Sequence, residues 1–368
     1  MKILILGDAP SSHIIKWANA FSDKGHQIYV FSLQKSDTSQ YRKDIKIICK
    51  EISAKLKFLN GGNFLKLLYL LTLPVIKKLI KEIKPDILHA HYASSYGLLG
   101  SLTKFHPYVL SIWGADVFSF PQKSIFHKQI FNFNIRAADK ILSTSEVMAK
   151  EIRKYTSRQI FITPFGIDIE IFKPGNKVKL IKGEFDFVIG TIKGLEEIYG
   201  IEYLIDAYCI VKERLKPTII KLVIVGGGSL EKKIKSLVVE KNLTDDIILT
   251  GKVNYSEIQS YHNLLDIYIA LSIYDDESFG VAILEASACE KPVIVSDVGG
   301  LPEVVEKNKT GFVVPVRNAE SAAEKIIELI NNKELRIKFG QAGRERVIKH
   351  YNWEICLQKM FDIYESVK

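Results

Sequence analysis

The chain has few cysteines and no repetitive tracts. Its 368 residues include only Cys49, Cys209, Cys289 and Cys356, and none of these stands at the short spacing of a zinc site or a disulfide framework. This scattering favours a reducing compartment. The composition is that of a globular protein, without internal repeats or low-complexity tracts.

The chain also lacks a hydrophobic run long enough to span a bilayer. Its longest apolar stretch, residues 63–80, is interrupted by Lys66 and Pro74 and is too short for a transmembrane helix. The start, "MKILILGD", has the pattern of a first strand that enters a turn, not that of a signal peptide. We therefore expect a cytoplasmic protein.

Several catalytic and binding motifs are missing. The sequence "GGGS" at 226–229 follows a candidate strand but lacks the third glycine of a dinucleotide fingerprint, which argues against NAD binding. No G-x-S-x-G elbow is present, so serine hydrolase chemistry has no nucleophile motif. His89 and His91 share one face of a candidate strand, but no further ligand cluster accompanies them, so we expect structural histidines and no metal site.

Positive charge is concentrated in the first half of the chain. The net charge is +9, but residues 1–168 contain 24 Lys and Arg against 12 Asp and Glu, a balance of +12. A basic first half points to anionic partners, either a phosphorylated substrate or an anionic membrane surface. Nucleic acid is not expected, because no recognition motif or aromatic-basic platform is present.

Two series of alternating strand and helix patterns run along the chain. Candidate strands occupy 2–7, 27–33, 86–91, 108–113, 140–144 and 160–165, and then 185–190, 219–228, 247–251, 266–271, 291–297 and 311–316. This order predicts an α/β protein with two doubly wound, Rossmann-like domains and a ligand site in the cleft between them. Residues 164–183, rich in proline and glycine, predict a linker. We expect domains at 1–168 and 169–351, and a C-terminal helix at 352–368 that crosses back to the first domain.

The stretch "ESFGVAILE", from Glu277 to Glu285, carries a carboxylate at each end of an apolar run. We expect a helix that opens near Ser278, with Phe279 and Gly280 in its first turn. Eight helical residues rise about 12 Å, too far for the paired acids of a glycoside hydrolase.

Two interpretations of this stretch remain open at this point. The free amides of a helix N-terminus suit a phosphate, and flanking carboxylates suit sugar and ribose hydroxyls, as in a nucleotide-diphosphate sugar. The alternative is that Glu277 is an ordinary loop acid and that Glu285 is a solvated helix residue.

The motifs together resemble those of retaining glycosyltransferases of family four, also called glycosyl transferase group one, which have the GT-B fold. The resemblance rests on "ESFGVAILEA" followed by "DVGGLPEVV", and on "GHQIYVFS", "DILHAHYA", "PFGIDIEIFKP", "LVIVGGGSLEKKI" and "HYNWEICLQKMFDIYE" in the same order. It covers nearly the whole chain and implies two domains facing each other across a cleft.

The resemblance also implies roles for the residues of the Glu277–Glu285 stretch. Glu277 would stand beside the donor sugar, Glu285 would accept ribose hydroxyls, and the segment of Ser278, Phe279, Gly280 and Val281 would bind sugar and phosphate. It implies a metal-independent enzyme without a cofactor, for which we favour a UDP-sugar as substrate.

The sequence departs from the family pattern at three places. Thr191 stands where an Arg is expected and Tyr199 where a Lys is usual, so we assign the phosphate role to Lys193.

The two other departures lie in the first half. Trp113 replaces a His that touches the donor sugar, while Asp116 keeps its place and is a candidate for orienting a substrate. "GDAPSSH" replaces the glycine-rich opening loop, which makes His13 a candidate for contact with acceptor or phosphate. The alternative for His13 is an ordinary surface histidine at a helix start.

The function we expect is the transfer of a hexosyl unit from a nucleotide-diphosphate sugar to a glycan or lipid-linked acceptor, with retention of configuration, in cell-surface polysaccharide synthesis. Glu277, Lys193 and Asp116 are the candidate catalytic residues. A nucleotide-sugar epimerase of the same fold and a non-catalytic nucleotide-sugar-binding partner are the alternatives.

A peripheral position on the inner face of the cell membrane is a further hypothesis. Residues 63–84 place apolar side chains beside Lys77, Lys78, Lys81 and Lys84, as in interfacial helices. The alternative is an ordinary helix that packs on the sheet with its lysines solvated.

Overall fold

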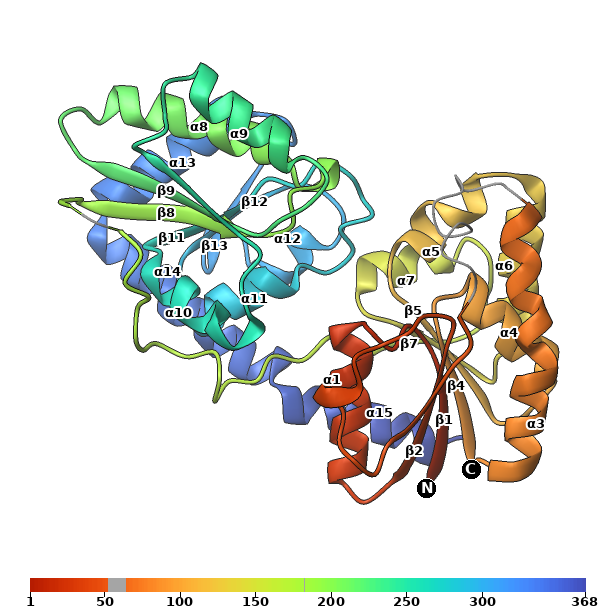
Figure 1. Cartoon of the computed structure of the whole chain (residues 1–368). Coiled ribbons are helices and arrows are strands. Elements are labelled where there is room, and N and C mark those ends of the chain that lie inside the picture. Colours follow the sequence, from red (N-terminus) through yellow and green to blue (C-terminus); the bar gives the residue numbers. More distant parts are fainter. Residues whose placement is uncertain (52–63, 182) are drawn as a thin grey trace. The chain divides into compact units, whose positions relative to one another are not determined.

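The computed structural model describes residues 1–51, 64–181 and 183–368, and these form two compact units (Figure 1). Unit 1 comprises Met1–Pro164 and Leu357–Lys368, and unit 2 comprises Phe165–Cys356. The expected domain boundary at 168 thus lies four residues beyond the division, and the final helix is shared between the units.

Unit 1 is built on a parallel sheet of seven strands in the order β3-β2-β1-β4-β5-β6-β7. The strands are β1 (Lys2–Leu6), β2 (Gln27–Ser32), β3 (Lys46–Cys49), β4 (Ile87–His91), β5 (Tyr108–Ile112), β6 (Lys140–Ser143) and β7 (Ile160–Ile162). Ile3, Leu4, Ile5 and Leu6 are wholly buried, as expected for a strand with helices on both faces. The edge strand β3 was not predicted, because it is short and only half-buried and so lacks a strong apolar pattern.

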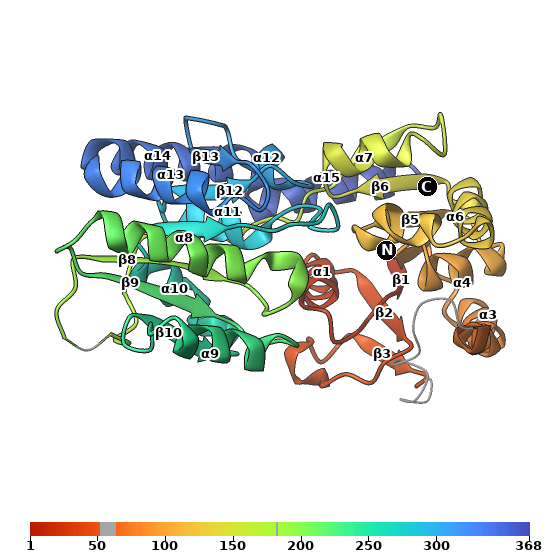
Figure 2. The same cartoon turned by 90° about the horizontal axis from the view of Figure 1, so that it is seen from above.

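Helices cover both faces of this sheet (Figures 1 and 2). One face carries α1 (Ser12–Asp23), against which Phe361 and Tyr364 of α15 (Trp353–Glu365) pack their rings. The other face carries α3 (Leu73–Ile83), α4 (Ser95–Thr103) and α6 (Ile125–Ala137), whose apolar side chains join the sheet in one core. Shorter elements are η1 (Thr38–Gln40), η2 (Phe64–Thr72), α5 (Ala115–Phe118), η3 (Phe120–Gln122) and α7 (Glu146–Ile152).

Unit 2 contains a parallel sheet of six strands in the order β10-β9-β8-β11-β12-β13. They are β8 (Phe187–Ile192), β9 (Ile220–Val225), β10 (Ile247–Gly251), β11 (Ile267–Ala270), β12 (Val293–Ser296) and β13 (Gly311–Val314). The strand order changes direction between β8 and β11, and ligands of such sheets bind beyond the carboxyl ends of the strands at this switch point.

The helices of unit 2 also lie on both faces of its sheet (Figure 1). One layer holds α8 (Ile201–Arg214), α9 (Glu231–Glu240) and α13 (Ala319–Asn331), and the other holds α10 (Ile258–Leu264), α11 (Val281–Ala288) and α14 (Lys333–Arg346). Short elements η4 (Glu197–Tyr199), η5 (Tyr255–Glu257), α12 (Leu301–Val304) and η6 (Val347–Tyr351) complete the unit.

The segment predicted as a linker begins as a packed part of unit 2. The amide of Ile167 donates to the carbonyl of Tyr351 at 2.7 Å, and the amide of Trp353 donates to the carbonyl of Ile167 at 2.9 Å. Phe172 is 1% exposed. The predicted linker thus begins at the division between the units, and its residues 165–172 are held in place by unit 2.

The basic segment proposed for membrane contact forms η2 and α3, apart from Asn63, which lies outside the described residues. Ile76 and Ile83 of α3 are buried in the core of unit 1, whereas its lysines and Lys84 are exposed. The helix thus packs one apolar side on the sheet and leaves its cations at the surface. Among the described residues, every helix is too short or too polar to cross a membrane.

Candidate functional site

The loops that follow β8 and β11 bring Lys193 and Glu277 together. Lys193 is the first residue after β8, and Glu277 lies in the loop between β11 and α11. Because β8 and β11 are neighbours at the switch point of the sheet, their carboxyl ends adjoin. The Lys193 Nζ donates to the Glu277 Oε1 at 2.8 Å, and the two side chains are only 11% and 10% exposed.

The surroundings of Lys193 favour its charged form. Burial alone would lower the pKa of Lys193, but the Glu277 carboxylate, with the hydroxyls of Tyr268 and Tyr199, outweighs burial and raises this pKa above its ordinary value. The Lys193 Nζ also lies 4.8 Å from the centre of the Tyr199 ring, within the range of a cation–π contact. Lys193 therefore carries a fixed positive charge that is paired with the Glu277 carboxylate.

Thr191 is uncharged and its side chain is buried. It lies inside β8, is 1% exposed and pairs in register with Ile224 of β9. The chain leaves the sheet two residues later, at Lys193. Lys193 is thus the first residue beyond the end of β8. The sequence alone does not define where this strand ends.

The helix that contains Glu285 begins later than predicted. α11 spans Val281–Ala288, and its N-cap is Gly280, with φ of 84°. Ser278 and Phe279 therefore precede the helix and do not cap it, because only the glycine can adopt this left-handed conformation without strain. The first amides of α11, those of Val281 and Ala282, have no partner within the helix and form its positive end.

Two glycines of "DVGGLPEVV" hold the backbone of the Glu277 loop. The amide of Gly300 donates to the Glu277 carbonyl at 2.9 Å, and the amide of Gly299 donates to Asp275 Oδ1 at 3.1 Å. A Cβ on Gly299 would lie 2.2 Å from the Glu277 carbonyl oxygen, and one on Gly300 would lie 2.1 Å from that of Ser278. Only glycine permits this close approach.

Phe279 anchors the same loop from the other side. Its side chain is 3% exposed, and its ring lies edge-on to the rings of Phe165 and Tyr351 at 5.7 and 5.9 Å. Any contact of Phe279 with a ligand would thus come from its backbone, because its ring is enclosed in unit 2.

Glu285 is buried and has two protein groups beside its carboxylate. It is 6% exposed, so its interpretation as a solvated helix residue is wrong. The Tyr255 hydroxyl donates to Oε1 at 3.4 Å, and the His262 Nε2 lies 3.5 Å from Oε2. Sequence reasoning missed both neighbours, because they come from η5 and α10 and share no motif with Glu285.

Asp116 in unit 1 holds a backbone turn. It is 4% exposed, and its carboxylate accepts hydrogen bonds from the amides of Ala93, Trp113 and Gly114 at 2.7, 3.1 and 2.8 Å. Burial raises the pKa of Asp116, while these amides act against that rise. In the structure this side chain fixes the loop that carries Trp113, and its role in orienting a substrate stays a prediction.

His13 is half-buried beside Trp113, with ring centres 5.7 Å apart, so it is not an ordinary surface residue. Burial, followed by the charge of Lys16, lowers the pKa of His13 to about 4, so its ring is neutral at pH 7. The ring of His91 also packs on Trp113, with ring centres 4.5 Å apart. His13 and Trp113 thus form one aromatic cluster at the carboxyl edge of the sheet.

His89 has a structural role, as expected from the sequence. It is wholly buried and its two ring nitrogens contact the Tyr364 hydroxyl at 2.6 Å and the Ser111 hydroxyl at 2.7 Å. Burial lowers its pKa to about 3. The ring therefore ties α15 to the sheet of unit 1 in its neutral form.

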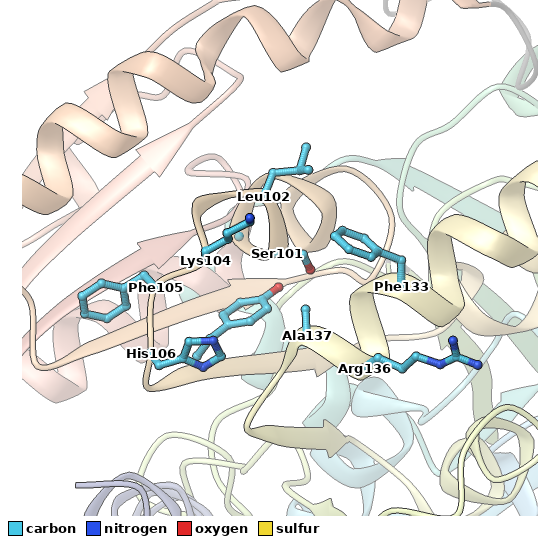
Figure 3. A pocket seen from close by; sticks show the side chains of 10 residues that line it. Ser101, Leu102, Lys104, Phe105, His106, Phe133, Arg136 and Ala137 are labelled. Carbon is cyan, nitrogen blue, oxygen red and sulfur yellow. The ribbon is translucent and has the colours of Figure 1, made fainter.

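A separate hollow of about 350 Å³ lies at the opposite edge of the unit 1 sheet (Figure 3). Lys104, Phe105 and His106, which precede β5, line it together with Phe133 and Arg136 of α6. It adjoins the amino end of β5, whereas ligands of parallel sheets bind beyond the carboxyl ends. It is therefore distinct from the positions of His13 and Asp116.

Comparisons with known proteins agree with this arrangement. Residues 173–346 match the family described as glycosyl transferases group 1, and residues 2–145 match the family described as glycosyl transferase 4-like. An uncharacterized glycosyltransferase of Methanocaldococcus jannaschii is 30% identical over 295 residues, which cover 79% of this chain and 78% of that protein. A GDP-mannose-dependent phosphatidylinositol monomannoside mannosyltransferase of Mycobacterium tuberculosis is 31% identical over 210 residues, 54% of each chain.

Solved structures of the same fold cover the whole chain. Sucrose-phosphate synthase from Thermosynechococcus elongatus superposes with a TM-score of 0.84 at 20% identity, covering 100% of this chain and 98% of that one. HepE from Anabaena, solved in complex with UDP, gives a TM-score of 0.81 at 18% identity and covers both chains fully. With its two parallel-sheet units and its two family matches, the chain belongs to the glycosyl transferases group 1 and has the GT-B fold.

Proposed function

We propose that this glycosyltransferase moves a hexosyl unit from a nucleotide-diphosphate sugar, a UDP-sugar in the first instance, to a glycan or lipid-linked acceptor. The observation that carries the proposal is the arrangement in unit 2 of a buried cation, Lys193, a buried carboxylate, Glu277, and the positive amino end of α11. An anionic diphosphate suits the cation and the helix end, and sugar hydroxyls suit the carboxylate.

The names of the relatives support this choice of substrates. The mycobacterial relative is named for GDP-mannose and a phosphatidylinositol acceptor, and the HepE structure was solved with UDP. We therefore place the enzyme in the synthesis of a cell-surface polysaccharide or glycolipid. Its proposed location is cytoplasmic, with peripheral contact to the inner face of the cell membrane.

In the proposed reaction the sugar keeps its anomeric configuration. The bond from the anomeric carbon to the leaving phosphate oxygen breaks, and the bond to the acceptor oxygen forms on the same face. The acceptor proton passes to the leaving phosphate oxygen. Lys193 and the amino end of α11 would stabilise the charge that develops on the diphosphate, which is the form of catalysis that a fixed charge in a buried site provides.

The other site residues have supporting roles in the proposal. Glu277 would accept a hydrogen bond from the donor sugar, and Glu285 would accept ribose hydroxyls. Val281 contributes its amide, while Ser278, Phe279 and Gly280 shape the loop before it. No metal or cofactor is assigned a role.

Unit 1 would bind the acceptor. His13, neutral at pH 7, can accept a hydrogen bond from an acceptor hydroxyl, and Asp116 acts as a positioning residue for the Trp113 loop.

The test is an assay of purified protein with a panel of UDP- and GDP-sugars, with extracted membrane lipids and polysaccharide as acceptors. Product is followed by mass spectrometry and its anomeric configuration by NMR. We expect free nucleotide to be released only when the acceptor is added. Sugar conversion without nucleotide release would indicate an epimerase, and nucleotide-sugar binding without turnover would indicate a binding partner.

A further inference from the structure

A buried histidine lies beside Glu285, and its ring nitrogens have no hydrogen bond in the described part of the chain. His262 on α10 is 0% exposed. A buried polar ring normally has a hydrogen-bond partner, because its burial without one costs free energy. The carboxylate oxygen Oε2 of Glu285 lies 3.5 Å from the His262 Nε2, slightly beyond a formed hydrogen bond.

The other neighbours of His262 are aromatic rings. Its ring centre lies 6.0 Å from that of Phe172 and 5.5 Å from that of Tyr268. These rings enclose the imidazole without supplying a hydrogen-bond partner in the structure. The Glu285 carboxylate is a polar group close enough for the imidazole to donate to after a small shift.

The Glu285 carboxylate is approached from two sides. Tyr255 reaches Oε1 at 3.4 Å, and His262 approaches Oε2. Each carboxylate oxygen can accept two hydrogen bonds, so one protein contact to each oxygen leaves capacity for two ligand hydroxyls. Two contacts from separate elements also fix the plane of the carboxylate, which a single contact would leave free to rotate.

We propose that His262 is a positioning residue that orients the Glu285 carboxylate toward the ribose of the bound nucleotide. Its Nε2–H donates to Oε2, and the contact closes to a hydrogen bond when ribose hydroxyls bind the opposite side of the carboxylate. His262 acts through Glu285 and does not touch the nucleotide. The inference rests on the proposed function, since it requires that the ligand carry a ribose.

The experiment measures the affinity for UDP and GDP, each against its 2′,3′-dideoxy counterpart, by titration calorimetry. The readout is the ratio of the two dissociation constants, which reports the ribose hydroxyls alone. The variants are His262→Phe, which keeps an aromatic ring, His262→Gln, which restores an N–H donor, and Glu285→Gln. Phe172→Leu is the packing control, because it disturbs the ring contacts of both His262 and Tyr255 without removing a polar group.

We expect the wild-type protein to bind the ribose form at least tenfold more tightly than the dideoxy form. His262→Phe should lower this ratio nearly to that of Glu285→Gln, and His262→Gln should restore most of it. Phe172→Leu should lower the melting temperature but keep the ratio. A wild-type ratio in His262→Phe, or an equal loss in Phe172→Leu, would overturn the inference.

A second measurement does not depend on any variant. Nitrogen-15 NMR of histidine-labelled wild-type protein with bound UDP should show His262 as the tautomer protonated at Nε2; protonation at Nδ1 alone would overturn the inference. Nucleotide binding without ribose discrimination would refute the role of His262 and leave the proposed function standing. Failure to bind either nucleotide would refute the proposed function itself.

Discussion

Lys193 and Glu277 are 84 positions apart in the chain and form an ion pair of 2.8 Å that is nearly closed to solvent. The pair exists because β8 and β11 are adjacent at the switch point of the unit 2 sheet. A buried pair of this kind offers a ligand both a cation for phosphate and a carboxylate for hydroxyls.

Loss of one partner of this pair should reduce both stability and turnover. Lys193→Ala leaves the Glu277 carboxylate buried without its cation, which typically costs about 3–5 kcal/mol. It also removes the charge that would stabilise the leaving diphosphate, so kcat should fall strongly. Urea unfolding and steady-state kinetics measure the two effects.

The double variant Lys193→Met/Glu277→Gln separates the effect on stability from the effect on turnover. It removes both charges, so we expect it to regain stability but not turnover. Lys325→Ala, at an exposed ion pair of α13, is the control and should leave kcat unchanged. Turnover near the wild-type level in Lys193→Ala would refute the assignment of Lys193.

Glu285→Ala should weaken the binding of nucleoside diphosphate. A hydrogen bond to a charged group contributes about 1.5–3 kcal/mol, so we expect a loss in this range in titration calorimetry. Glu290→Ala, at the surface beyond α11, is the control. An affinity that stays unchanged in Glu285→Ala would show that this carboxylate does not contact the nucleotide.

Gly299→Ala should displace the loop of Glu277. The added methyl group would lie 2.2 Å from the Glu277 carbonyl oxygen, and φ at this position is 54°. Gly251→Ala is a matched control, because its φ is 68° and the added methyl would meet none of the described atoms within 4 Å. The control should lose about 1–2 kcal/mol for the left-handed conformation.

Gly299→Ala should lose more stability than Gly251→Ala. It should also lose turnover, because the added methyl group forces the Glu277 loop to move. Equal stability of the two variants, with full activity in Gly299→Ala, would show that the contact with Glu277 is not required.

The stability of the protein should fall on acidification below pH 6.5. Burial lowers the pKa of His89 to about 3, so between pH 6.5 and 3 the unfolded chain binds a proton that the folded chain does not. The contribution of His89 to the free energy of unfolding is thus complete above pH 6.5, and it decreases by about 1.4 kcal/mol per pH unit below that pH. Urea unfolding from pH 7.5 to 5 measures the slope.

In His89→Gln the free energy of unfolding should depend less steeply on pH, by the contribution of one titrating group, about 1.4 kcal/mol per pH unit. Gln358→Ala, an exposed substitution on α15 that changes no titratable group, is the control and should keep the wild-type slope. A slope unchanged in His89→Gln would contradict the low pKa of His89.

Unit 1 should bind vesicles that contain anionic lipid. The lysines of α3 and Lys84 are exposed beside Leu71, which is 74% exposed. Each basic residue near an anionic surface contributes roughly 1 kcal/mol, and this attraction weakens with salt. In flotation assays we expect binding to phosphatidylglycerol vesicles but not to phosphatidylcholine vesicles, and loss of binding when Lys77, Lys78, Lys81 and Lys84 are changed to glutamate.

Charge reversal of the three exposed lysines of α9 in unit 2 is the control and should leave flotation intact. Flotation that is insensitive to lipid charge and to reversal at residues 77–84 would show that α3 is an ordinary helix packed on its sheet.

Part of the candidate site was predictable from the sequence. Apolar runs between glycines and prolines located twelve of the strands, because a strand buried on both faces must be continuously apolar. The spacing of Glu277 and Glu285 around Gly280 likewise marked the segment that joins β11 to α11. These features are local, so neighbouring residues are sufficient to specify them.

The contacts within the site were decided by the tertiary structure. Only the adjacency of β8 and β11 pairs Lys193 with Glu277, and only the packing of α10 against α11 brings His262 to Glu285. The start of α11 at Val281 likewise follows from the conformation of Gly280 and from the fit of Gly299 against the Glu277 backbone. Long-range packing sets these distances, and no pattern along a single stretch of chain encodes them.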